Sequence, residues 1–178
     1  MKKVSFYLFA LLATLTLATS CKKEKPITPD PPQHTLADEF VGKWIDGNVN
    51  PAMFADYDGV REDDMENTMA YNFKKDGTAE QFIYYFDEAE SKQLLFYRKG
   101  TVTFDAATKT LNFNPKEGWY RVYENETKVE DEDLSAEGLF PKYAPKYHDC
   151  KIEEYNGGTF LVAINNNNEN VDFAKVNW

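Results

Sequence analysis

From Met69 to the end of the chain, apolar and polar residues alternate far more often than apolar residues recur at helical spacing. A period of two is typical of β-strands, because successive side chains point to opposite faces of the sheet. The pattern therefore predicts an all-β chain. The predicted strands are one at Trp44 and others over residues 68–74, 78–86, 94–98 with 101–104, 110–114, 119–123, 147–155, 159–164 and 171–177.

Residues typical of turns separate these runs. Asp76-Gly77 lies between two alternating runs, which is the strongest short signal for a β-hairpin. Gly100 interrupts the run over 94–104, where a bulge or bend would let a sheet curl. About eight short antiparallel strands with tight turns predict an up-and-down β-barrel, and a β-sandwich is the alternative.

Two segments do not follow the alternation. Residues 47–66 are mainly polar with scattered apolar side chains, and residues 125–145 contain an acidic run followed by Leu139-Phe140-Pro141. Long loops within small domains are usually functional or disordered. We expect both segments to be long loops, the first over a barrel mouth, and to make the first contacts with any partner.

The first 20 residues have the pattern of a cleaved export signal. Lys2 and Lys3 precede an apolar run over 6–18, and small residues follow up to Cys21. A positive start, an apolar stretch of about 7–15 residues and small residues at the cut define such a signal. The run is shorter than the roughly 20 apolar residues that span a bilayer. Residues 1–20 are therefore predicted to be removed.

Ala18-Thr19-Ser20-Cys21 resembles the lipobox of bacterial lipoproteins, in which the cysteine is acylated and becomes the new N-terminus. The resemblance implies that Cys21 carries lipid such as palmitate and anchors the protein to the outer membrane of a bacterial cell envelope. An ordinary cleaved signal followed by a chance cysteine is the alternative. Residues 21–38 hold four prolines, which predicts an extended tether. The basic Lys22-Lys23-Glu24-Lys25 favours the periplasmic face over the cell surface.

The net charge excludes one class of partner. The formal charge is −10, and losing two lysines and no acid with the signal makes it −12. Nucleic-acid binding needs a basic footprint, so no nucleic-acid partner is expected. Residues 39–178 have the size of one domain.

The start of this domain resembles a known family. Gly42-Lys43-Trp44 is similar to the N-terminal signature of lipocalin and lipocalin-like proteins, and Phe73-Lys74-Lys75-Asp76-Gly77-Thr78 is similar to a segment of bacterial lipocalin-like lipoproteins. The resemblance implies a barrel over 39–178 with Trp44 closing one end. It also implies a late basic residue over the tryptophan ring, for which Lys175 is the counterpart. Gly42, Trp44 and Lys175 would then be structural.

Candidate catalytic and metal-binding residues are few. Alternation would place His148 and Cys150 on one strand face, where a Cys-His dyad is conceivable, although a lone buried cysteine more often acts as a small hydrophobe. The acidic runs 62–64 and 130–133 lack the ligand pattern of an EF-hand, so solvated charge is the favoured interpretation. We therefore expect no enzyme activity, no metal and no cofactor.

Aromatic residues are abundant, with 11 Tyr and 13 Phe. The leading hypothesis is a lipocalin-like barrel that holds a small apolar or amphipathic ligand in its interior. The side chains predicted to face that interior are Phe82, Tyr84, Phe86, Phe96 and Trp119. The alternative is a filled barrel whose two long loops bind a protein or a glycan, and a Cys-His hydrolase ranks last.

Overall fold

The computed structural model describes residues 36–140 and 146–178, which form an antiparallel β-structure with three short helical turns. The all-β prediction is confirmed. The lipidation residue Cys21 and the predicted signal and tether up to residue 35 lie outside the described residues. In chain order the elements are η1 (Asp38–Phe40), β1 (Gly42–Asp46), η2 (Pro51–Ala55), β2 (Thr68–Phe73), β3 (Thr78–Asp87), β4 (Lys92–Asp105), β5 (Thr110–Glu124), β6 (Thr127–Asp133), α1 (Ala136–Leu139), β7 (His148–Tyr155), β8 (Gly158–Ile164) and β9 (Asn170–Val176).

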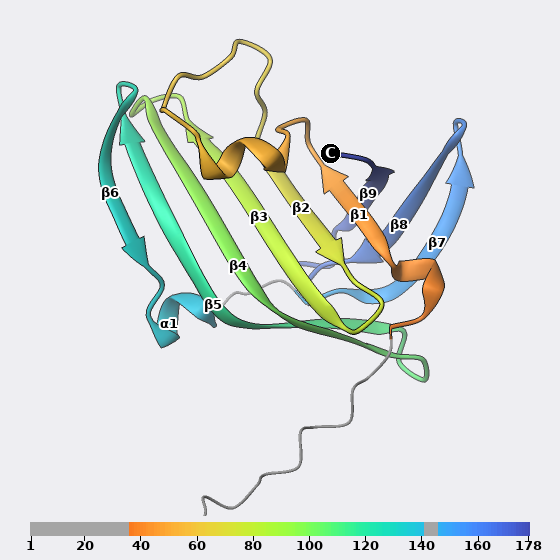
Figure 1. The fold of residues 1–178 in the computed structure, drawn as a ribbon. Coiled ribbons are helices and arrows are strands. Elements are labelled where there is room, and N and C mark those ends of the chain that lie inside the picture. Colours follow the sequence, from red (N-terminus) through yellow and green to blue (C-terminus); the bar gives the residue numbers. More distant parts are fainter. Residues whose placement is uncertain (1–35, 141–145) are drawn as a thin grey trace, which may run out of the picture. The chain divides into compact units, whose positions relative to one another are not determined.

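The strands make one sheet in the order β6-β5-β4-β3-β2-β1-β9-β8-β7. Two meanders, β1 to β6 and β7 to β9, are joined where β1 pairs with β9. The edge strands β6 and β7 do not pair with each other, so the sheet is open (Figure 1). This strand pairing is compatible both with a curled, barrel-like sheet and with a β-sandwich.

The start of β7 instead meets the start of β5. The amide of Leu111 donates to the carbonyl of Tyr147 at 3.1 Å, and the amide of Cys150 donates to the carbonyl of Lys109 at 2.9 Å. Figure 1 shows the lower ends of β4 and β5 curling under the sheet toward β7. These bonds hold the two meanders together on the side away from the β1 and β9 pair.

The predicted Asp-Gly hairpin connects β2 and β3. Gly77 has φ +78°, and the Asp76 carboxylate accepts a hydrogen bond from the Thr78 amide at 2.9 Å. A positive φ is readily adopted only by glycine, which explains why the Asp-Gly pair gives a reliable turn signal.

The bend predicted at Gly100 is present within β4. The β4 and β5 register shifts between Lys99 and Gly100, opposite Pro115 and Glu117. A Cβ added to Gly100 would lie 2.0 Å from the Asn114 carbonyl oxygen, so only glycine allows this approach. The separate strands predicted over 110–114 and 119–123 are wrong, since β5 runs through both.

The prediction of a loop over 125–145 is also wrong for its first part. Residues Thr127–Asp133 form β6, in which every residue is exposed. An edge strand with both faces in solvent has no apolar alternation, and charge on such an edge prevents pairing with other chains. The strand therefore escapes a search for periodicity. Since β5 joins two of the nine predicted runs, β6 brings the total back to nine strands.

The front face of the sheet, named here for the side that carries Tyr84 and Leu95, is covered by residues 47–66. Phe54 of η2 and Val49 are buried against Tyr84, Leu95 and Tyr123. The predicted loop over a barrel mouth thus packs flat on β3 to β5, in front of the sheet in Figure 1.

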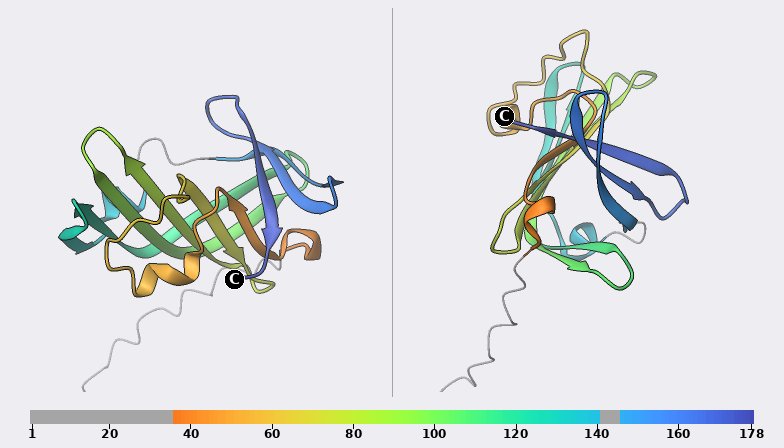
Figure 2. Two further views of the ribbon diagram at one scale, coloured as in Figure 1. Left: turned by 90° about the horizontal axis from the view of Figure 1, so that it is seen from above. Right: turned by 90° about the vertical axis from the view of Figure 1, so that its right-hand side faces the viewer.

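The back face, which carries Trp44 and Tyr71, is covered by β7 to β9. The Tyr71 ring lies 5.6 Å from the Phe173 ring and 6.0 Å from the Tyr147 ring. Figure 2 shows the β7 to β9 meander projecting on the side opposite η2. The buried cluster between them is the larger of the two cores, and it contains Leu36, Phe40, Trp44, Tyr71, Phe73, Ala79, Val102, Leu111, Tyr147, Cys150, Leu161, Ala163 and Phe173.

Candidate functional site

The five residues predicted to line a common interior are divided between the two faces. Phe82 and Tyr84 lie opposite Tyr97 and Leu95 in the β3 and β4 register, whereas Phe96 lies opposite Ile83. Directly opposed residues share a face, so Phe96 points to the back and the others to the front. The prediction of one shared lining is therefore wrong for Phe96.

The other four, Phe82, Tyr84, Phe86 and Trp119, pack with the segment 47–66 and not against β7 to β9. The error arose because the face that Phe96 takes depends on the pairing register of β3 and β4, which the sequence does not give.

Polar groups fasten the segment 47–66 to the front face. The Gln93 amide group donates to the Gly59 carbonyl at 2.7 Å, and its oxygen accepts from the hydroxyls of Tyr84 at 3.0 Å and of Tyr57. Burial raises the pKa of both tyrosines, so their hydroxyls stay protonated donors. The front face is thus closed over most of its apolar area.

A cleft lies on the front, between η2 and the sheet. It measures about 320 Å³ and is lined by Phe82, Tyr97 and Trp119. The Tyr97 and Trp119 rings are stacked at 5.7 Å, and Arg121 lies over Trp119 at 4.2 Å while donating to the Phe54 carbonyl. Arg121 therefore belongs to the anchoring of η2.

The back face carries an open groove over β4, β5 and β6. It has a volume of about 410 Å³, and no residue of β7 to β9 lines it. Its floor is apolar, with the Phe96 and Tyr120 rings stacked at 5.8 Å between Leu94 and Val122. Its rim carries three acids, Glu130, Glu132 and Asp133, and one cation, Lys92, which pairs with Glu124 at 3.4 Å. Ligand pockets typically combine such an apolar floor with a few polar groups.

Arg98 lies on the same face of β4 as Phe96, about 7 Å further toward the core. Its side chain is buried, with 5% exposure. Its Nε donates to Gln81 Oε1 at 2.7 Å and its Nη1 donates to the Leu139 carbonyl at 3.3 Å. Burial lowers the pKa of Arg98, but an arginine remains charged in proteins.

Two tyrosines complete this buried polar group, which we call the Arg98 cluster (Tyr71, Gln81, Arg98, Tyr147). Gln81 Nε2 donates to the Tyr71 hydroxyl at 2.6 Å, and the Tyr71 and Tyr147 hydroxyls are 3.2 Å apart. Both hydroxyls also reach the Met69 sulfur, at 3.4 and 3.0 Å. Burial raises the pKa of Tyr71 to about 12 and that of Tyr147 well above its usual value, so neither supplies a negative charge.

The tryptophan end of the back face has the contact that the family resemblance implies. Trp44 is fully buried, its indole N–H donates to the Phe40 carbonyl at 2.8 Å, and Lys175 Nζ lies 5.1 Å from its ring centroid. Gly42 has φ +144° beside the Lys175 side chain. These three residues hold the start of β1 to the end of β9.

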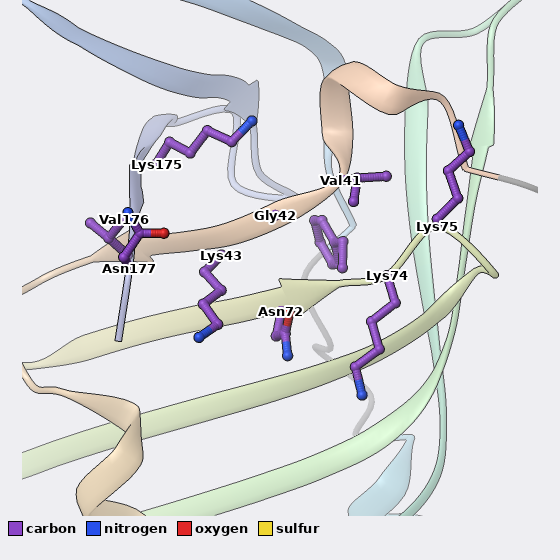
Figure 3. A pocket seen from close by; sticks show the side chains of 10 residues that line it. Val41, Gly42, Lys43, Asn72, Lys74, Lys75, Lys175, Val176 and Asn177 are labelled. Carbon is purple, nitrogen blue, oxygen red and sulfur yellow. The ribbon is translucent and has the colours of Figure 1, made fainter.

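A further hollow of about 520 Å³ is bordered by four lysines near β1 and β2. Figure 3 shows that Lys75 and Lys175 extend to one side and Lys43 and Lys74 to the other. Each lysine is also engaged: Lys74 with Glu80 at 3.5 Å, Lys75 with Asp38, Lys175 with Trp44, and Lys43 with the Trp178 carbonyl. The lysines do not converge on one ligand.

His148 and Cys150 do not alternate as predicted. The register of β7 shifts between His148 and Lys151, and Asp149 has φ +50°. Cys150 is consequently buried in the main core while His148 is exposed, 3.4 Å from the Thr110 hydroxyl. Burial raises the pKa of the Cys150 thiol to about 11, which disfavours the nucleophilic thiolate.

The described residues contain neither a metal-ligand cluster nor a membrane-spanning helix. No three acidic, histidine or cysteine side chains in 36–140 and 146–178 come together as metal ligands do. Within the same ranges, no helix has the length and apolar character needed to cross a bilayer.

No family model matches this chain, and no curated protein or solved structure does either. The site must therefore be interpreted from its own geometry.

The sequence reasoning missed the Arg98 cluster altogether. The signal that could have revealed it is positional: Arg98 continues the alternation of Leu94 and Phe96, so a charged residue occupies an apolar position of a strand. Tyr71 and Tyr147 have no such signal. Tyr71 is brought into one row with Gln81 and Arg98 by the register of β2, β3 and β4, and Tyr147 comes from a distant segment that packs on the back face.

Proposed function

We propose that the protein is a non-enzymatic, lipocalin-like lipoprotein of the bacterial cell envelope that binds a small amphipathic ligand. Lipid on Cys21 would anchor it to the outer membrane, with the periplasmic face favoured. The observation that carries the proposal is the open back-face groove with its apolar floor of Leu94, Phe96, Tyr120 and Val122. Phe96 is the one predicted ligand residue that lies in this groove.

The groove has the properties of a ligand site and not of an unfinished core. Its volume of about 410 Å³ lies in the range of small-molecule pockets, roughly 300–1,000 Å³. Arg98 follows Leu94 and Phe96 on the same face of β4 but does not line the groove. An apolar floor with charged side chains on its rim suits a molecule with one apolar and one polar end.

The proposal is tested with N-phenyl-1-naphthylamine, a neutral apolar fluorescent probe, and with residues 21–178 carrying Cys21→Ser so that no acyl chain is present. We expect saturable binding that Phe96→Ala weakens about tenfold, since burying an aromatic ring contributes about 1.5–3 kcal/mol. Phe82→Ala is the matched control, because Phe82 is also partly buried but lies on the front face. An equal loss of probe affinity in the two variants, or no binding of the probe to the wild type, would contradict the proposal.

A second candidate function is an interaction module that binds a protein or a glycan through its two long segments. The observation that favours it is the exposure of Val60, Val129 and Phe140, which are 51, 48 and 58% exposed and lie in 47–66 and 125–145. Native mass spectrometry of protein taken from its own host's envelope separates the two functions. A mass excess lost on denaturation supports the small ligand, and an unliganded mass supports the module.

A further inference from the structure

The apolar groove on the back face has acidic groups on its rim that no described cation neutralises. Glu130, Glu132 and Asp133 line the groove, and none of the ion pairs found among the described residues includes them. Lys92 is the cation of the described rim, and it already pairs with Glu124 at 3.4 Å. The charge of the rim therefore complements a ligand that carries a positive charge.

The acid between the two glutamates of β6 shows the contrast with the opposite face. Asp131 lies opposite Arg121 in the β5 and β6 register, and so faces the front. Its carboxylate pairs with Arg121 at 3.2 Å and also with Lys128. The fold thus supplies cations to the front-face acid of this strand, whereas Glu130 and Glu132 on the back face meet the groove without them.

The two glutamates lie at the edge of an aromatic ring. The Tyr120 hydroxyl donates to the Glu132 carboxylate at 3.3 Å. Hydrogen bonding to Glu130 and the nearby charge of Glu132 raise the pKa of Tyr120 to about 12, so its phenol stays neutral. The Tyr120 ring stacks with Phe96 at 5.8 Å. Carboxylates and aromatic ring faces both attract cations, and the groove brings them together.

The two stacked rings also have room for a cation. Trp44, Phe86 and Trp119 each have a lysine or an arginine over the ring, but no cation of the described residues lies over Phe96 or Tyr120. Both rings are only partly buried, so part of each is open to the groove. A cationic group of a ligand can therefore take the position that a side chain takes at the other rings.

The charges along the groove place such a group at its inner half. Lys92 lies beyond Leu94 at the outer end, and Asp133 lies at the inner end. A cation is repelled by the first and attracted by the second. The inner half is also where Phe96 and Tyr120 stack.

We propose that the ligand of the groove is a single-chain amphiphile with a cationic amine head group. The head group lies beside Glu130 and Glu132 and against the Tyr120 ring, and the alkyl chain lies over Leu94 and Val122. The inference rests on the proposed function, because the alkyl chain occupies the apolar floor of the proposed groove. It adds the charge of the head group and the residues that select it.

Three compounds with a ten-carbon chain test the head group. Decyltrimethylammonium, 1-decanol and decanoate are positive, neutral and negative, and the first keeps its charge at every pH. With residues 21–178 carrying Cys21→Ser, isothermal titration below the critical micelle concentration should give decyltrimethylammonium an affinity about tenfold above that of 1-decanol. Decanoate should bind more weakly than 1-decanol. Equal affinities for the first two compounds, or tighter binding of decanoate, would overturn the inference.

Glu130→Gln combined with Glu132→Gln tests the two carboxylates. Both residues are exposed, so the double variant should fold, lose the preference for the cation and keep its affinity for 1-decanol. Glu88→Gln combined with Glu90→Gln is the matched control, because these glutamates are also exposed, lie in the turn between β3 and β4 and do not line the groove.

The control is needed because the net negative charge of the protein attracts any cation over a distance. Both double variants change the net charge by the same amount. A preference for decyltrimethylammonium that falls equally in the two, or that survives in the groove variant, would assign the effect to the net charge and overturn the inference.

NMR on the unaltered groove locates the head group directly. We expect nuclear Overhauser contacts from the trimethylammonium protons to the Tyr120 and Phe96 rings. Phe96→Leu keeps an apolar side chain but removes the ring, so it should weaken decyltrimethylammonium more than 1-decanol. Contacts to these rings from the terminal methyl group of the chain alone would contradict the proposed orientation and the head-group site.

The outcomes also separate the inference from the function beneath it. Equal binding of decyltrimethylammonium and 1-decanol overturns the cationic head group and leaves the apolar groove standing. Binding of none of the three compounds, together with no uptake of N-phenyl-1-naphthylamine, overturns both.

Discussion

Burial decides the charge of the groups at the centre of the back face. Tyr71 is 2% exposed and Gln81 1%, and their neighbour Tyr147 is also buried. Desolvation disfavours ionised tyrosine, so the hydroxyls remain neutral donors. Arg98 is left as the one charged side chain of the cluster.

The buried tyrosines predict a loss of stability in alkali. The folded-state pKa of Tyr71, about 12, lies above the unfolded value of about 10. The folded protein therefore keeps a proton that the unfolded chain releases, so the stabilisation present below pH 10 is lost between pH 10 and 12. For Tyr71 the loss is on the order of 3 kcal/mol, measured as the free energy of unfolding in urea.

Tyr71→Phe is the control for this profile. The substitution removes the titrating group, so the free energy of unfolding should decline less steeply above pH 10. Below pH 10 the variant should be about 1 kcal/mol less stable than the wild type, because it lacks the hydrogen bonds of the hydroxyl. A wild-type stability that stays constant from pH 8 to 11.5 would contradict the prediction.

At the scale of elements, the long β4 and β5 hairpin performs two tasks. Its upper half forms the floor of the groove, and its lower half curls below the sheet to meet β7 (Figure 1). The change of direction occurs at the register shift beside Gly100. The bulge beside Gly100 therefore separates the half of the hairpin that lines the groove from the half that meets β7.

Gly100→Ala should be strongly destabilising for this reason. The added methyl group would meet the Asn114 carbonyl oxygen at 2.0 Å and Pro115 Cα at 2.7 Å, both of which belong to the backbone. We expect the free energy of unfolding, measured with a chemical denaturant, to fall by about 3 kcal/mol. Gly157→Ala is the comparison, since its methyl group meets nothing within 4 Å and its φ of +78° costs only about 1–2 kcal/mol. A smaller loss at Gly100 than at Gly157 would show that the bulge adapts.

At the scale of the whole molecule, the net charge bears on how the protein would attach to a membrane. The chain without residues 1–20 carries a formal charge of −12, which opposes contact with anionic lipid head groups. Two acyl chains bind a membrane stably where one does not, at about 0.8 kcal/mol per buried CH₂. We therefore propose that lipid on Cys21 attaches the protein to the membrane.

Cys21→Ser should release the protein from the membrane fraction when it is expressed in a bacterium that processes lipoproteins. Fractionation followed by immunoblotting measures the shift. Cys150→Ala is the control, because Cys150 is buried in the core and should leave both the fractionation and the ligand binding unchanged. Retention of Cys21→Ser in the membrane fraction would argue for another anchor.

Local patterns in the sequence determined the strand class, the Asp76-Gly77 hairpin and the bend at Gly100, because each depends on neighbouring residues alone. The same patterns missed β6, since an exposed edge strand is held by backbone hydrogen bonds and needs no apolar alternation. They also divided β5 into two predicted strands, since Pro115 interrupts the apolar pattern without ending the strand.

Tertiary structure alone decided which segment covers which face. The alternation of side chains along a strand places Phe82 and Tyr84 on the same face. Only the packing shows that η2 lies over them and that β7 to β9 cover the opposite face. The same packing brings Tyr147 to Tyr71 and Arg98 across a wide separation in sequence. A site assembled from distant segments leaves no local pattern, because its residues become neighbours only when the two faces are covered.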